Sequence, residues 1–145
     1  MRHIPTVVRY LIGLVFFVFG LNGFLHFLPQ PPMEGGAGAF AGALAATGYM
    51  FPLIKGTEVI AGALLLANRF VPLALTLLAP VVVNIFLFHT VLTPLNPMAI
   101  LLVVGLAYLA YSYRDAFRPM LAATVSPALP AAEPAAATKP ARAVS

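Results

Sequence analysis

The sequence predicts an all-α integral membrane protein, with four transmembrane helices in a bundle and a disordered C-terminal tail. Of its 145 residues, 61% are hydrophobic and only 8% are charged, and the mean hydropathy is +0.97. Soluble domains carry about 25% charged residues, so this chain has too few to cover a water-facing surface. Its apolar residues are also gathered into long runs, separated by proline-rich turns.

Four of these runs fit membrane spans, at about residues 7–28, 51–67, 71–92 and 98–113. The first would be about 33 Å long as a helix, which is enough to cross a bilayer core. It exceeds the roughly 7–15 apolar residues of a cleaved signal peptide, so we expect a retained span. Pro80 falls inside the third run, where a proline in a helix predicts a kink.

The remaining segments are less hydrophobic. Residues 30–38 read as a loop, and 39–48 as either a short interfacial or re-entrant helix or an ordered loop, being too short to span. Residues 1–118 form the predicted transmembrane domain. Residues 119–145 are rich in Ala and Pro and have too little large apolar surface to offset the entropy of ordering. They therefore predict a disordered cytoplasmic tail.

The basic residues predict the orientation. They flank the N-terminus, the link between the second and third spans, and the end of the fourth span: Arg2, Arg9, Arg69, Arg114, Arg118, Lys139 and Arg142. The other two connections contain none. Because cytoplasmic loops are enriched in Lys and Arg, both termini are expected in the cytoplasm. No basic stripe alternates with aromatic residues, which argues against nucleic-acid binding.

Six polar residues in the first three spans are the candidate ligand-binding residues, since an ionisable group within a span costs about 2.5–3.5 kcal/mol. By depth they fall into the non-cytoplasmic half of the bundle, in a deeper tier and an upper tier. The deeper tier is Asn22, Glu58 and Asn84, and the upper tier is His26, Lys55 and His89.

Spacing along each helix relates these residues. Asn22 and His26 lie four apart and are expected to share a face. Lys55 and Glu58 lie three apart and can form an ion pair, whereas the spacing of Asn84 and His89 does not stack them. Structural alternatives remain: an ion pair that fixes helix register, amides that bond between helices, and histidines at the interface. The spacing fits no metal motif, and it identifies no catalytic residue.

Glycine and alanine strips on the first two spans predict close helix packing. On the first span the strip is Gly13, Gly20 and Gly23, and on the second it is Gly56, Ala61, Gly62 and Ala63.

Several segments resemble the DoxX family of small bacterial membrane proteins over about residues 7–113. They are RYLIGL at 9–14, FGLNGF at 19–24, TGY at 47–49, KGTEV at 55–59, LLLANRF at 64–70 and APVVVNIFLFH at 79–89. The resemblance implies a four-helix bundle in the bacterial inner membrane. It also implies an association with quinone-linked, sulfur-linked or oxidative-stress-linked redox complexes. A branch of the family uses thiol pairs, which this cysteine-free chain cannot form.

Three functions follow as alternatives. The first is a membrane subunit of such a redox complex, which binds a quinone at the polar site and takes electrons from a partner protein. The second is a non-enzymatic scaffold or assembly factor, and the third a small transporter or permeability pathway. Besides the lipid bilayer, the expected partners are the redox protein and further copies of this chain.

Overall fold

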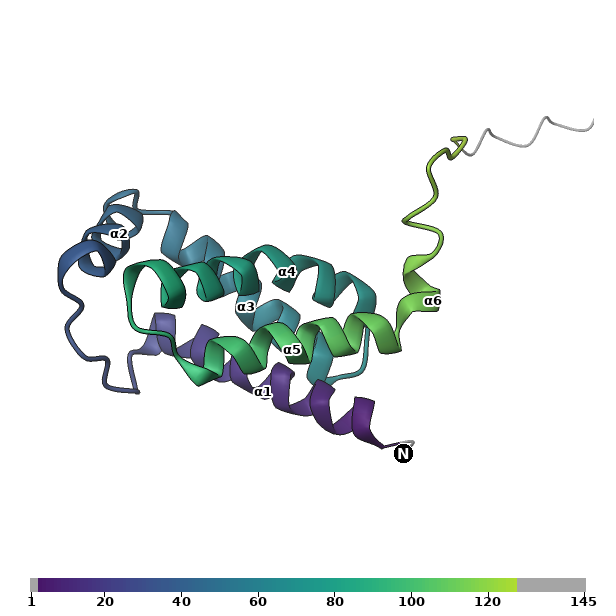
Figure 1. Ribbon diagram of the computed structural model, residues 1–145, viewed down its shortest axis with the longest axis horizontal. Helices are drawn as coiled ribbons and strands as arrows, with labels where there is room; N and C mark the ends of the chain where they lie inside the picture. Colours follow the sequence, from purple (N-terminus) through teal and green to yellow (C-terminus); the bar gives the residue numbers. More distant parts are fainter. Residues whose placement is uncertain (1–2, 128–145) are drawn as a thin grey trace, which may run out of the picture.

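A computed structural model describes residues 3–127, in which every regular element is a helix (Figure 1). The elements are α1 (Ile4–Leu25), α2 (Gly35–Ala46), α3 (Met50–Leu66), α4 (Val71–Leu87), a π-helix η1 (Phe88–Leu92), α5 (Pro97–Ser112) and α6 (Arg114–Phe117). The long helices α1, α3, α4 and α5 run side by side along the molecule, and α2 crosses one end of them. The predicted helical bundle is therefore present.

Three of the four apolar runs form helices within one residue of their predicted bounds, when α4 and η1 are taken together. The first differs, because α1 begins and ends three residues before the predicted 7–28. Pro5 is accommodated in the first turn, where a missing N–H costs nothing. At the other end His26 adopts left-handed backbone angles (φ 51°) and its N–H donates to the Asn22 carbonyl at 2.9 Å, which ends the helix.

The predicted end of the loop at 30–38 is wrong, because α2 already begins at Gly35. Gly35 has φ +60°, a conformation that glycine adopts without strain. The alanines that follow have the highest helix propensity of any residue. After α2 the chain turns at Gly48 (φ +73°), and the axes of α2 and α3 meet at 92°. The short-helix alternative for 39–48 is thereby confirmed.

α4 runs through Pro80 without a break in its helical structure. Its departure from α geometry comes later, at η1, where the Thr93 N–H donates to the Phe88 carbonyl five residues back at 3.1 Å. Such π turns rotate the following side chains relative to an α-helix. The residues on either side of Phe88 therefore face different parts of the bundle.

The closest helix packing is between α1 and α3, where backbones touch. A Cβ atom added to Gly62 would lie 2.6 Å from the Phe17 nitrogen and 2.9 Å from the Gly13 oxygen. α3 packs on α4, α4 on α5, and α5 back on α1, which closes the bundle. The predicted packing role holds for Gly13 and Gly62. Gly56 faces open space, with no atom near its added Cβ.

The outer surface is strongly apolar. Large side chains such as Leu11, Leu14, Leu53 and Leu101 are each more than half exposed, and a soluble monomer rarely shows such continuous apolar surface. In the part of the chain that the structure describes, two helices are long and apolar enough to cross a membrane, namely α1 and the 22-residue Val71–Leu92 helix. The bent pair α2–α3 would make a third if it counts as one broken span, and α5 is a shorter apolar helix.

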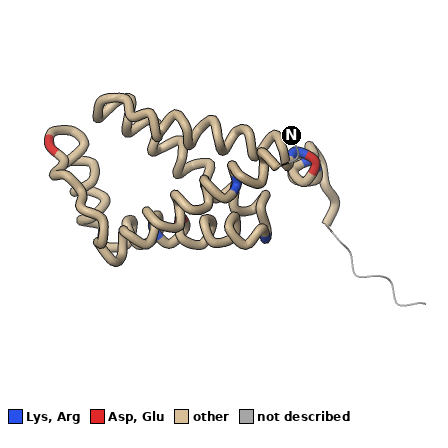
Figure 2. The backbone as a smooth tube through the Cα atoms, turned by 90° about the horizontal axis from the view of Figure 1, so that it is seen from below, with Lys and Arg blue, Asp and Glu red and all other residues tan. Residues whose placement is uncertain are grey.

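Charged residues lie at both ends of the bundle, and a few lie between them (Figure 2). The end with the N-terminus also carries the α3–α4 link with Arg69, and α6 with Arg114. Glu34 lies at the opposite end, beside α2. Of the predicted tail 119–145, residues 119–127 form turns and irregular backbone. The remainder, 128–145, and residues 1–2 lie outside the described residues.

Candidate functional site

A buried ion pair on α3 is the centre of the candidate site. The Lys55 ammonium donates to the Glu58 carboxylate at 2.8 Å, with the Lys55 side chain 21% exposed and that of Glu58 only 4%. The two residues are three apart, so one helical turn brings their side chains together. The predicted pairing is confirmed.

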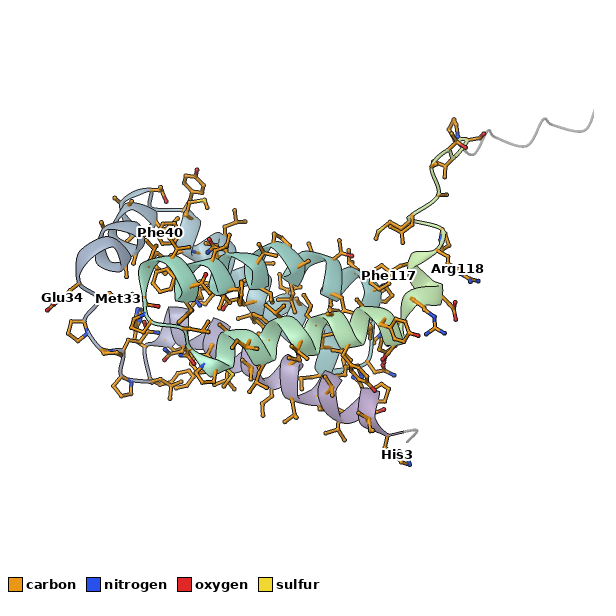
Figure 3. The ribbon with its side chains drawn as sticks, viewed as in Figure 1. His3, Met33, Glu34, Phe40, Phe117 and Arg118 are labelled. Carbon is orange, nitrogen blue, oxygen red and sulfur yellow. The ribbon has the colours of Figure 1, made fainter. Side chains whose placement is uncertain are left out.

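The ion pair borders a first cavity of about 480 Å³ between α2, α3 and α4. Most of its lining residues are apolar, and they include phenylalanines from α2, α3 and η1. The lining residues are Met33, Phe40, Ala41, Leu44, Met50, Phe51, Ile54, Lys55, Glu58, Pro80, Val81, Asn84, Ile85 and Phe88. Figure 3 places Phe40 and Met33 at the end of the molecule opposite Phe117 and Arg118.

The same ion pair also borders a second cavity of about 250 Å³, on the side of α1 and α5. Four polar side chains line it: Lys55, Glu58, His89 and Asn96. Ile85 lies in the wall of both cavities. The ion pair therefore stands between two spaces of different size and polarity.

Asn84 and His89 are divided between these two spaces. Asn84 lines the first cavity with the ion pair, and His89 lines the second. Nδ1 of His89 lies 2.9 Å from the Ile85 carbonyl oxygen. Their five-residue spacing, across the start of η1, separates the two side chains, as the sequence predicts for residues that do not stack.

Asn22 and His26 line neither cavity. The expectation that they share a helical face is wrong, because α1 ends at Leu25 and leaves His26 exposed. The Asn22 side chain is buried, and its Oδ1 accepts a hydrogen bond from the Leu28 N–H at 2.6 Å. Asn22 thus satisfies backbone groups at the end of its own helix, which is a local role.

The sequence grouped Arg9 with the basic residues that flank the N-terminus, but its side chain is only 3% exposed. Its guanidinium donates to the Leu65 carbonyl near the C-terminus of α3 and lies 4.5 Å from the Tyr10 ring centroid. Carbonyls at a helix C-terminus lack intrahelical partners and carry partial negative charge. Arg9 therefore ties α1 to the end of α3. The sequence does contain a signal for this burial, because Arg9 lies in the first turns of a span whose glycines allow close packing against another helix.

Within residues 3–127, no group of three histidine or acidic side chains is placed to hold a metal ion. The chemistry that the site offers is hydrogen bonding and charge. An ammonium has three hydrogens, so Lys55 can donate to further groups while paired with Glu58. The Asn84 amide adds a donor and an acceptor at the same cavity.

Comparison with known proteins gave no match: no family model, no curated protein and no solved structure is similar to this chain.

Proposed function

We propose that this chain is a DoxX-like, four-span membrane protein that binds a small amphipathic ligand, such as a quinone, in the first cavity. In this proposal it is a membrane subunit of a redox complex in the bacterial inner membrane. One observation carries the ligand site: the Lys55–Glu58 pair, with Glu58 buried and Lys55 partly buried, lines a cavity whose walls are otherwise mostly apolar. Pockets of this composition are the common form of small-molecule sites.

The four-span arrangement rests on the helices and the charges. α3 and α5 have 17 and 16 residues, or about 25 and 24 Å at 1.5 Å per residue, which a locally thinned bilayer accommodates. They lie beside α1 and the continuous helix formed by α4 and η1, both of which are long enough to span. The position of Arg69 and Arg114 at one end of the bundle supports a cytoplasmic location for both termini under the positive-inside rule.

The residues at the first cavity fit a quinone ring. Its carbonyl oxygens need hydrogen-bond donors, which Lys55 and Asn84 supply. Phe40, Phe51 and Phe88 give aromatic surface for stacking. When bound, a quinone accepts electrons and protons. The protein's part is to position the ring against Lys55, and to hold a proton near it on Glu58.

The electrons would come from a partner protein. With no cysteine, this chain has no dithiol to oxidise. The apolar outer surface of the bundle would serve for contact with that partner or with further copies of the chain.

Native mass spectrometry with a short-chain ubiquinone tests the proposal. Asn84→Leu removes a polar group from the cavity wall without breaking the ion pair. Val83→Ala is the matched control, because Val83 is the preceding residue on α4 and does not line the first cavity. We expect the wild type and Val83→Ala to retain the quinone, and Asn84→Leu to lose it while unfolding at the same temperature.

The scaffold is the second candidate, and it too has a supporting observation. Arg9 and Asn22 are buried polar residues that bond only to backbone groups, and the α1–α3 interface is a backbone contact. These features make a rigid bundle without a ligand. Equal quinone binding by all three proteins would contradict a site at Asn84. No quinone bound by any of them, together with a co-purified partner protein, would favour the scaffold.

A further inference from the structure

The second cavity runs from the exposed surface to the buried ion pair. Asn96 lines it at the exposed turn between η1 and α5. Glu58 lines it inside the bundle, where its side chain is 4% exposed. This turn lies at the end of the bundle that α2 covers (Figure 1). A single space therefore connects that end with Glu58.

Polar atoms in this space are available to water. Nδ1 of His89 faces the Ile85 carbonyl at 2.9 Å, so in a neutral ring Nδ1 carries the hydrogen and Nε2 can accept another bond. Oδ1 of Asn96 accepts from the Met98 N–H at 2.9 Å, which leaves its amide hydrogens for other partners. Glu58 bonds to Lys55 through Oε2, and its second oxygen can also accept.

Water enters a cavity that is polar and large enough to give each molecule two or more partners, whereas purely apolar cavities stay dry. At about 250 Å³, the second cavity has room for several water molecules. We propose that it is a water-filled chamber through which the Lys55–Glu58 pair exchanges protons with the aqueous phase at the α2 end. Its use in redox chemistry rests on the proposed function, but its hydration does not.

The titratable groups facing this chamber are few. Lys55 and Glu58 come from α3, and His89 comes from η1. The side chains that α1 and α5 contribute to its lining are all non-ionisable. A proton that reaches Glu58 through the chamber therefore passes His89, bound water, or both.

A water-soluble carbodiimide tests the proposal on the full chain in lipid nanodiscs. The reagent activates a carboxyl group, and the adjacent Lys55 amine then displaces it. The product is an amide between Lys55 and Glu58, formed with net loss of one water, while the carbodiimide leaves as a urea. Peptide mass spectrometry measures this cross-link. Modification of Glu34 and Asp115, both exposed, reports reagent activity in the same sample.

Two variants identify the route. Ala99→Leu fills the second cavity, and Ala41→Leu fills the first. We expect the cross-link in the wild type and Ala41→Leu, and its several-fold loss in Ala99→Leu with Glu34 still modified. His89→Phe narrows the second cavity from the other wall, should Ala99→Leu fail to fold.

Two results would overturn the chamber. One is no cross-link in the wild type despite modification of Glu34 and Asp115. The other is a cross-link blocked by Ala41→Leu but unaffected by Ala99→Leu or His89→Phe, which would place access in the first cavity. Neither result depends on quinone binding. Failure of the water-filled chamber can therefore be distinguished from failure of the proposed quinone site.

Discussion

Lys55 and Glu58 are joined at 2.8 Å one turn apart on α3, and both side chains line two cavities. A buried charge without its partner is far more costly than a buried pair. The same two residues therefore bear on the stability of the bundle and on the chemistry of both spaces, and variants must separate the two effects.

Glu58→Gln is expected to destabilise the protein, because it leaves the Lys55 ammonium without its counter-charge. Removal of one partner of a buried pair costs about 3–5 kcal/mol, and the partial exposure of Lys55 puts this case at the lower end. Lys55→Met combined with Glu58→Gln should recover most of this loss. Unfolding free energies in detergent, arranged as a double-mutant cycle, measure the coupling. A double variant less stable than either single one would argue against this account.

The α1–α3 contact predicts a strong position effect for glycine. Gly62→Ala should cost about 1–3 kcal/mol, as overpacking does, because the new Cβ meets the Phe17 backbone at 2.6 Å. Gly56→Ala, on the same helix, has no atom within 4 Å of its new Cβ and should be neutral or slightly stabilising. Thermal unfolding of the two variants compares them. Equal losses would mean that α1 and α3 do not touch in this way.

Arg9→Met should weaken the attachment of α1 to the end of α3. A hydrogen bond from a charged donor contributes about 1.5–3 kcal/mol, and the Leu65 carbonyl would lose it. Arg69 lies in the exposed link that follows, so trypsin reports local opening there. We expect faster cleavage after Arg69 in Arg9→Met than in the wild type, with Arg114→Met as the control. Unchanged cleavage would show that Arg9 does not hold this end.

The orientation can be measured by reporter fusions. Alkaline phosphatase is active only outside the cytoplasm, and green fluorescent protein fluoresces only inside it. Fusions after Pro94 should give phosphatase activity, and fusions after Arg69 or Arg118 should give fluorescence, since the proposed topology puts the basic links in the cytoplasm. Fluorescence after Pro94 but not after Arg69 would show that the bundle has the opposite orientation. Fluorescence after both residues would show that the segment between them does not cross the membrane.

The long helices were predictable because they coincide with apolar runs. The α3–α4 link at Asn68 and Phe70, both with positive φ, follows such a run directly. The sequence-based prediction was wrong where the ends of a helix are set by hydrogen bonds rather than by composition. The Asn22 side chain and the left-handed His26 end α1 early, and neither effect is visible in hydrophobicity.

The candidate site was predictable in part. Lys55 and Glu58 pair within one helix, so their spacing was sufficient. Side-chain positions that depend on tertiary packing could not be predicted from the sequence. Asn84 and His89 belong to different cavities across η1, and a π turn has no clear sequence signal. The buried position of Arg9 follows from the close approach of α1 and α3, which the glycines indicate but do not locate.

Photo-crosslinking with an azido-quinone tests the ligand site most directly, because it reports where the ring lies. The structure offers a competing location, an apolar groove between α1 and α5 lined by Leu11, Leu101 and Tyr108 among others. We predict adducts on peptides that contain Phe40, Phe51 or Phe88, competed by unlabelled quinone and lost in Asn84→Leu. Adducts confined to the α1–α5 groove, or unaffected by competitor, would contradict the assignment of the ligand to the first cavity.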